Sequence, residues 1–251
     1  MKKIKYLIFI LIISGSLFFL FGPEILPENL QFQQALNSTL INSDVIIIFN
    51  SGGWGNTPLE EAEDFAPAIK GIEKTLDSWG YHSVVIPYKR TKNGLWGKLW
   101  GIKDSFSSFR FSSENLAEKV EFLTENLPDK KIIIAGLSNG ASLVDESMEK
   151  ISENTQNSVY AITAGIPFWS EPYESQNTLH LNNNKKDALV TGEIKSLVFS
   201  LIKAPFVWIG AKINGQNIPF SKAIQAQGHD YCWSSPEVGP EIVTFLRYKF
   251  R

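Results

Sequence analysis

The residues best suited to do chemistry start with a serine set between glycines. Ser138 stands in the segment Gly136–Gly140 (GLSNG), between the apolar run Lys131–Ala135 and a stretch with helical spacing. A sharp turn from strand to helix exposes such a serine, and it requires small residues two positions away on either side. Gly136 and Gly140 meet that requirement. The segment therefore predicts that Ser138 is a nucleophile at the start of a helix.

A serine hydroxyl becomes an effective nucleophile only when a base accepts its proton. The chain has three histidines, at His82, His180 and His229. His82 precedes an apolar run, which is the wrong end of a parallel sheet for a ligand. His180 lies inside the apolar run TLHL, so we expect a hydrogen-bonded core residue. His229 follows a short apolar segment and precedes the last helical pattern, so it is the predicted base.

A carboxylate should hold the imidazole in the correct tautomer. Asp187 lies in the loop after Thr178–Leu181, between nucleophile and base in chain order, although its neighbouring lysines also fit a solvated surface loop. Glu171, after the run Val159–Thr163, is the rival. The predicted acid is Asp187, with Glu171 as the alternative.

Two backbone N–H groups are needed to stabilise a tetrahedral oxyanion. One should come from Asn139, directly after the nucleophile. The other should come from the glycine-rich loop Ser51–Gly55, which follows the apolar run Val45–Phe49. Because glycine lets the backbone approach a substrate closely, Gly53 is the preferred donor, with Trp54 as the alternative.

Strand and helix patterns alternate along the chain. Continuous apolar runs bounded by turns are typical of strands buried on both faces. The pattern predicts an α/β fold with a mostly parallel central sheet and helices on both faces. The predicted strands are 45–49, 83–87, 131–135, 159–163, 178–181 and a short one near 223–227, and the predicted helices include 58–79, 114–127 and about 240–250.

With these motifs in place, the chain resembles the α/β-hydrolase superfamily. The elbow 136–140, the glycine loop after the first strand, Asp187 and Gly228-His229 occur in its Ser…Asp…His order. The resemblance covers residues 44–250 and implies a serine hydrolase that works through an acyl-enzyme, with no cofactor. One departure is that many members have His-Gly in the oxyanion loop, where this chain has Ser51-Gly52.

The N-terminal segment differs from the rest. Lys2, Lys3 and Lys5 precede an uncharged, mostly apolar run from Tyr6 to Gly22. We therefore expect residues 1–22 to be a membrane anchor or a signal sequence, 23–43 a tether and 44–251 the hydrolase domain. The lysines place the N-terminus in the cytoplasm and the domain outside it. The alternative is secretion after signal cleavage.

Composition excludes several other classes. The net charge of −2 gives no reason to expect nucleic-acid binding, and the single cysteine, Cys232, excludes an intramolecular disulfide. With so few histidines and one cysteine we expect no metal site. The predicted substrate is a small-molecule or lipid ester. The alternatives are acyl transfer or peptide cleavage by the same triad, and a non-catalytic binding protein.

Two segments bear on the surroundings of the site. The stretch 89–111 is basic and aromatic, and it either lies at the rim of the site or packs its aromatic side chains on the domain. The apolar segment 194–210 is interrupted by Lys195, Lys203 and Pro205. We expect it to be a core helix, with a hydrophobic lid as the alternative.

Overall fold

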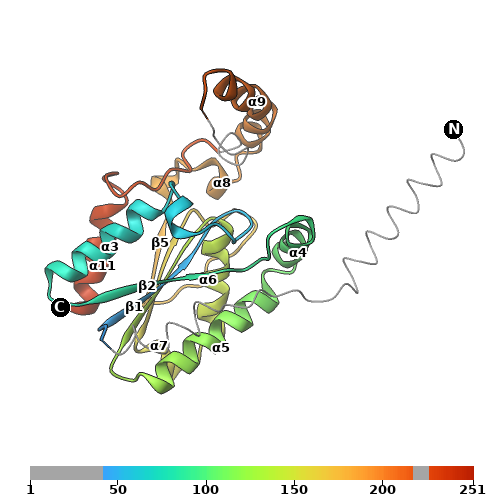
Figure 1. Ribbon diagram of the computed structural model, residues 1–251. Coiled ribbons are helices and arrows are strands. Elements are labelled where there is room, and N and C mark those ends of the chain that lie inside the picture. The colour runs from blue at the N-terminus through green and yellow to red at the C-terminus, as the bar shows by residue number, and fades with distance from the viewer. Residues whose placement is uncertain (1–41, 217–225) are drawn as a thin grey trace, which may run out of the picture.

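A five-stranded parallel sheet forms the centre of the computed structural model, which describes residues 42–216 and 226–251 (Figure 1). The strands lie in the order β2-β1-β3-β4-β5, and all four neighbouring pairs are parallel. The bounds are β1 Val45–Asn50, β2 Ser83–Tyr88, β3 Lys131–Leu137, β4 Val159–Ala164 and β5 Thr178–Leu181.

The three inner strands are buried on both faces. Every residue of β1 and β4 is buried, and so is every residue of β3 except Lys131. Such strands need apolar side chains at successive positions, which explains the continuous runs VIIIF and KIIIA. The edge strands β2 and β5 are partly exposed.

Helices cover both faces of the sheet, as Figure 1 shows, and each pair packs on its own apolar cluster. On one face, helices α3 and α11 pack against side chains such as Ile47 and Ile133. On the other, α5 and α6 pack against Ile46 and Ile134. The bounds are α3 Ala66–Ser78, α5 Arg110–Asn126, α6 Asn139–Lys150 and α11 Gly239–Phe250. The predicted α/β class is therefore confirmed.

The strand order creates a switch point between β1 and β3. From β1 the chain goes to β2 on one side, and it returns to β3 on the other side of β1. In open parallel sheets ligands bind at the carboxyl ends of the strands beside such a point. Asn50 at the end of β1 lies opposite Gly136 in β3, so the loops Ser51–Gly55 and Gly136–Gly140 meet there.

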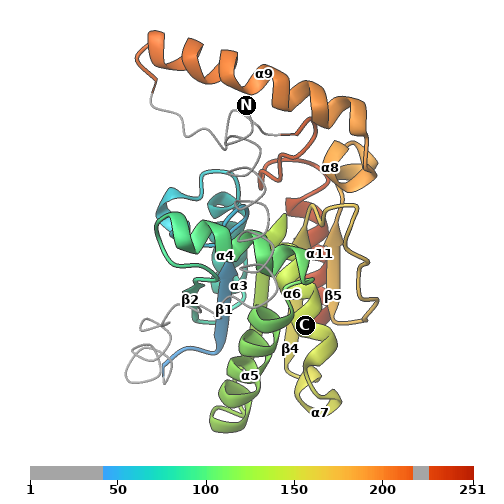
Figure 2. The same ribbon diagram turned by 90° about the vertical axis from the view of Figure 1, so that its right-hand side faces the viewer.

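Helix α9 (Ile194–Ile213) lies apart from the sheet in both ribbon views, joined to it through α8 (Ala188–Thr191) (Figure 2). The prediction of a core helix at 194–210 was wrong. Only Ala204 and Ala211 in this helix are buried, while Phe199 and Phe206 are 64% and 73% exposed. Periodicity could not reveal this, because apolar residues surround the helix on all sides and mark no inward face.

The remaining short elements are η1 Leu59–Glu61, α4 Leu95–Phe106, α7 Glu153–Gln156 and η2 Asn183–Lys185. The predicted helix 58–79 is thus divided into η1 and α3. The predicted anchor 1–22 and most of the tether 23–43 lie outside the described residues. So does most of the predicted strand 223–227, whose last two residues are not in a strand.

Candidate active site

Ser138 lies on a strained turn between β3 and α6. Its φ of 54° and ψ of −120° are unusual for a residue with a side chain. The flanking glycines explain how the turn closes. A Cβ on Gly136 would lie 2.3 Å from the Gly140 carbonyl oxygen, and a Cβ on Gly140 would lie 2.5 Å from that of Asn50. The two glycines therefore allow β3, the turn and the end of β1 to pack this closely.

Asp187 and His229 form a hydrogen-bonded pair. His229 Nδ1 lies 2.7 Å from Asp187 Oδ2, and the Asp187 side chain is fully buried. The Tyr231 hydroxyl donates to the same oxygen at 2.8 Å. The backbone N–H of Leu189 donates to Oδ1, also at 2.8 Å. Both carboxylate oxygens are therefore occupied, which holds the acid in one orientation.

These contacts keep the Asp187 carboxyl ionised. Burial acts to raise its pKa, but the hydrogen bonds and charge of His229, with the bonds from Tyr231 and Leu189, outweigh burial and hold the pKa below its usual value. The pKa of Tyr231 is raised, first by burial and then by the neighbouring carboxylate. Tyr231 thus remains a hydrogen-bond donor, and Asp187 remains a charged acceptor facing the imidazole.

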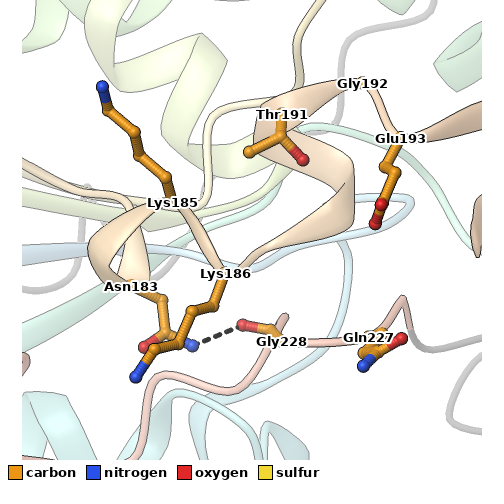
Figure 3. Close-up of a pocket in the computed structure, with 8 residues that line it drawn as sticks. All are labelled: Asn183, Lys185, Lys186, Thr191, Gly192, Glu193, Gln227 and Gly228. Atoms are coloured by element: carbon orange, nitrogen blue, oxygen red, sulfur yellow. Dashed lines mark hydrogen bonds between the residues drawn. The ribbon is translucent and has the colours of Figure 1, made fainter.

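Backbone contacts join the loop of the acid to that of the base. The Ala188 N–H donates to the Gln227 carbonyl at 2.9 Å, and the Asn183 side chain donates to the Gly228 carbonyl at 2.7 Å (Figure 3). A Cβ on Gly228 would lie 2.1 Å from the Lys186 carbonyl oxygen, so only glycine permits this approach. The loops are thereby held in register, and His229 is brought to Asp187.

An open cavity of about 840 Å³ lies between the same two loops. Figure 3 shows Asn183 directed towards the segment that carries Gly228, with Thr191 and Glu193 on another side. Ser138 is not among its lining residues, so we do not assign this cavity to the reacting part of a substrate. Its lining residues are Asn183, Lys185, Lys186, Thr191, Gly192, Glu193, Gln227 and Gly228.

The end of β4 connects the nucleophile to the base. The Ser138 N–H donates to the Ala164 carbonyl at 2.8 Å. The next residue, Gly165, has a φ of 63°, and a Cβ there would lie 2.6 Å from His229 Cε1. Ser138 and the imidazole therefore contact adjacent residues of one turn. The fold brings the predicted nucleophile, base and acid to the same edge of the sheet.

The predicted oxyanion donors also lie beside Ser138. The Ser138 carbonyl accepts from Ala141 and Ser142 inside α6. Because a trans peptide directs its N–H away from its carbonyl, the Asn139 N–H points out of the helix N-terminus. Likewise the Gly52 carbonyl accepts from Gly55 at 3.1 Å, which directs the Gly53 N–H out of that turn.

The other predicted candidates lie elsewhere. Glu171 is exposed, and His229 binds Asp187 instead. His180 on β5 is hydrogen-bonded to Thr163 Oγ1 at 2.8 Å and to the Tyr173 carbonyl at 3.2 Å, as expected for a structural histidine. His82 is exposed at the start of β2, which is the opposite edge of the sheet.

Sequence reasoning missed Tyr231, Gly165 and Arg90. The sequence gives a weak indication of Tyr231, because in an extended segment a residue two positions after His229 lies on the same side as His229. Gly165 follows a buried strand at the ligand edge, where a glycine indicates close approach. Arg90 stands among the basic residues of the 89–111 stretch, where nothing in the sequence distinguishes it, yet its side chain is buried, as are those of Trp100 and Phe109. Trp96 and Phe106 of that stretch remain exposed.

Within residues 42–216 and 226–251, no group of three or more His, Cys, Asp or Glu side chains is arranged to hold a metal ion.

Comparison with known proteins yields similarities of fold alone. No protein-family model and no curated protein matches the sequence. A Trichoderma reesei cutinase in complex with a C11Y4 phosphonate inhibitor matches with a TM-score of 0.43 and 16% identity, over 61% of this chain and 71% of the cutinase. An acetylxylan esterase matches with a TM-score of 0.39 and 15% identity, over 55% of this chain and 82% of the esterase.

Proposed function

We propose that the chain is a serine hydrolase that cleaves a carboxylic ester through an acyl-enzyme. The observation that carries this proposal is the buried Asp187–His229 pair, with its 2.7 Å bond, at the sheet edge where Ser138 occupies its strained turn. A buried, ionised carboxylate bound to Nδ1 leaves Nε2 of the imidazole to accept a proton. The alternative acid, Glu171, has no comparable arrangement in its exposed position.

The proposed reaction proceeds in two halves. Ser138 Oγ attacks the ester carbonyl carbon while His229 Nε2 takes the hydroxyl proton, and the N–H groups of Asn139 and Gly53 stabilise the oxyanion. The C–O bond to the alcohol then breaks, and His229 returns its proton to the leaving alcohol. Water, deprotonated by His229, next attacks the carbonyl carbon of the acyl-enzyme. The bond from that carbon to Ser138 Oγ then breaks, His229 returns the proton to Oγ, and the acid is released.

Acyl transfer or peptide cleavage would use the same groups and differ only in the acceptor or the leaving group. A non-catalytic binding protein is the alternative of another class. It is disfavoured because all three triad side chains are present and because the acid is held at both oxygens.

We also propose that the enzyme works at a membrane, outside the cytoplasm, on an ester with an apolar acyl group. Helix α9 supports this, because it is long and apolar enough to cross a membrane and only 11% of its most apolar window is buried. Its charged residues are Lys195, Lys203 and Lys212, which favour anionic lipid. In the chain the helix lies between Asp187 and His229, and it contacts α8, which begins one residue after Asp187.

Labelling with a fluorophosphonate probe tests the nucleophile. The folded wild-type protein should be labelled, and the Ser138→Ala variant should not. Hydrolysis of a series of p-nitrophenyl esters should follow the same pattern. If a folded wild-type protein is neither labelled nor active on any ester of the series, the proposal is wrong.

Two substitutions that each replace a carboxylate by the matching amide test which residue is the acid. Asp187→Asn should lower kcat by about 10⁴-fold, because the amide stabilises the wrong imidazole tautomer. Glu171→Gln should leave kcat unchanged. The opposite result would assign the acid to Glu171.

A further inference from the structure

Arg90 has both ends of its guanidinium group committed to the backbone beside Ser138. It follows β2 and is 1% exposed. Its Nη2 donates to the Gly53 carbonyl oxygen, and its Nη1 donates to the Asn139 carbonyl oxygen at 3.1 Å. These carbonyls belong to the two residues whose N–H groups are the proposed oxyanion donors.

A second contact draws the same two segments together. The Asn139 side-chain amide donates to the Gly53 carbonyl at 3.2 Å. The Arg90 N–H also donates to the Gly55 carbonyl at 2.7 Å, which joins the end of β2 to the glycine loop. The loop after β1 and the first turn of α6 are therefore linked by two side chains, those of Arg90 and Asn139.

The surroundings of Arg90 are built to hold a buried cation. Asp104 Oδ2 on α4 lies 3.8 Å from Arg90 Nε, and the Asp104 side chain is fully buried. The Phe109 ring lies 4.8 Å from the guanidinium carbon, and Gly55 provides room, since a Cβ there would lie 2.8 Å from Arg90 Cβ. Burial lowers the pKa of Arg90 to about 10, so the group remains charged at neutral pH.

We infer that Arg90 is a positioning residue that sets the oxyanion hole, holding the residues Gly53 and Asn139 at a fixed separation and orientation through the carbonyl groups that follow their donor N–H groups. This inference rests on the proposed function. A buried charge is costly to keep, and a planar fork with two parallel donors is the side chain suited to hold two carbonyls at once. Because both terminal nitrogens are occupied and the side chain is buried, Arg90 acts on the substrate only through the backbone.

If Arg90 has this role, its replacement should weaken stabilisation of the transition state and leave binding of the ester nearly unchanged. Donors that drift from the oxyanion weaken the tetrahedral intermediate much more than the bound ester. The Arg90→Met variant keeps the length of the side chain and removes its donors. Its kcat should fall about 100-fold, the size of losing one oxyanion donor, with KM within about threefold of wild type. For the Arg90→Lys variant, kcat should fall about 10-fold, because an ammonium group cannot hold both carbonyls in one plane.

The inhibition constant Ki of a trifluoromethyl ketone is a measurement that would not change if Arg90 had only a structural role. Ser138 adds to this ketone and forms an oxyanion, so its Ki depends on the oxyanion hole. Across wild type, Arg90→Lys and Arg90→Met, Ki should rise in proportion to the fall in kcat/KM, while KM stays nearly constant.

A double variant separates catalysis from folding. Arg90→Met alone leaves the buried Asp104 without its cationic partner, with the Ser112 hydroxyl still donating to it, and this destabilises the protein. Arg90→Met/Asp104→Leu removes both charges, so its thermal midpoint should recover while kcat stays about 100-fold low. Arg110→Met is the matched control, because this arginine is exposed and its contacts are with its helix neighbours Glu114 and Phe111. It should have wild-type kcat.

The outcomes separate the two proposals. A folded double variant with wild-type kcat, or a Ki that does not follow kcat/KM, would overturn the role of Arg90 alone. Failure of the wild-type protein to hydrolyse any ester would overturn the proposed function, and the oxyanion role would fall with it.

Discussion

Each oxygen of Asp187 has a separate set of donors. Oδ1 accepts from the Leu189 N–H, and Oδ2 accepts from both His229 and Tyr231. Because the carboxylate is buried, these bonds must compensate for its lost hydration. Tyr231 thus has two effects, since it stabilises the ionised acid and leaves a single orientation for the imidazole.

Replacing Tyr231 with phenylalanine should lower stability at neutral pH and make stability less dependent on pH in the acid range. The folded pKa of Asp187 lies below its usual value. Its charge therefore stabilises the fold above about pH 4, and this contribution is lost as the pH falls through the folded pKa. Without the Tyr231 hydroxyl the pKa is depressed less. The Tyr231→Phe variant should then be about 1–2 kcal/mol less stable at pH 7, with the difference narrowing below about pH 4.

Urea midpoints measured from pH 3 to pH 7 would check this prediction. Tyr248→Phe is the control, because Tyr248 is 80% exposed and the change should have no effect at any pH. A difference for Tyr231→Phe that stays constant from pH 3 to pH 7 would contradict the explanation.

The elements meet most tightly where β1, β3 and α6 converge. Gly140 in the first turn of α6 lies against the carbonyls of Asn50 and Ser51 at the end of β1. This contact places the helix N-terminus, and hence the Asn139 N–H, next to the oxyanion loop. Helix α6 can take this position only because Gly140 has no side chain.

The Gly140→Ala substitution should therefore be damaging although alanine favours helices. The new methyl group would lie 2.5 Å and 2.6 Å from two backbone oxygens, which cannot rotate away. We expect a loss of about 1–3 kcal/mol in the free energy of unfolding, together with a reduced kcat. Gly210→Ala in α9 is the matched control, since nothing lies within 4 Å of its Cβ position. It should gain about 0.5–1 kcal/mol.

Denaturant unfolding of both variants and ester turnover would measure these changes. If Gly140→Ala were as stable and active as Gly210→Ala, then α6 would not depend on this contact for its place.

At the scale of the whole molecule, most of the large apolar side chains that are exposed among residues 42–216 and 226–251 lie on α9, away from the sheet (Figure 2). A monomeric soluble protein rarely exposes a contiguous apolar surface of this kind. In the chain α9 follows the acid loop, and it contacts α8, which begins one residue after Asp187. A lipid surface is the partner that fits the proposed function.

The double variant Ile202→Glu/Phe206→Glu should lower turnover of a long-chain ester in anionic phospholipid vesicles at least 10-fold. Both side chains are more than 60% exposed, at 63% and 73%. Glutamate opposes both apolar burial and attraction to anionic lipid. Turnover of a soluble short-chain ester should stay unchanged.

Tyr248→Glu, a change at an exposed aromatic residue of α11, should affect neither substrate. Equal losses on both substrates for the α9 variant would mean that α9 supports the site itself and that the lipid role is wrong.

The strands, the turn at Ser138 and the fold class could be predicted from the sequence because they depend on local patterns. A strand buried on both faces requires a continuous apolar run, and a nucleophile between strand and helix requires glycines two residues away. The chain order of Ser138, Asp187 and His229 likewise identified the loops that contain the candidate site.

Only the tertiary structure decided which of these residues meet. That His229 binds Asp187 rather than Glu171, that Tyr231 shares the same oxygen, and that Arg90 joins Gly53 to Asn139 are contacts between distant parts of the chain. The exposure of α9 was decided in the same way, since an apolar helix does not indicate whether anything packs on it. The local sequence pattern indicates which side chains a segment tends to bury. Which residues of different segments come into contact depends on how the segments pack together.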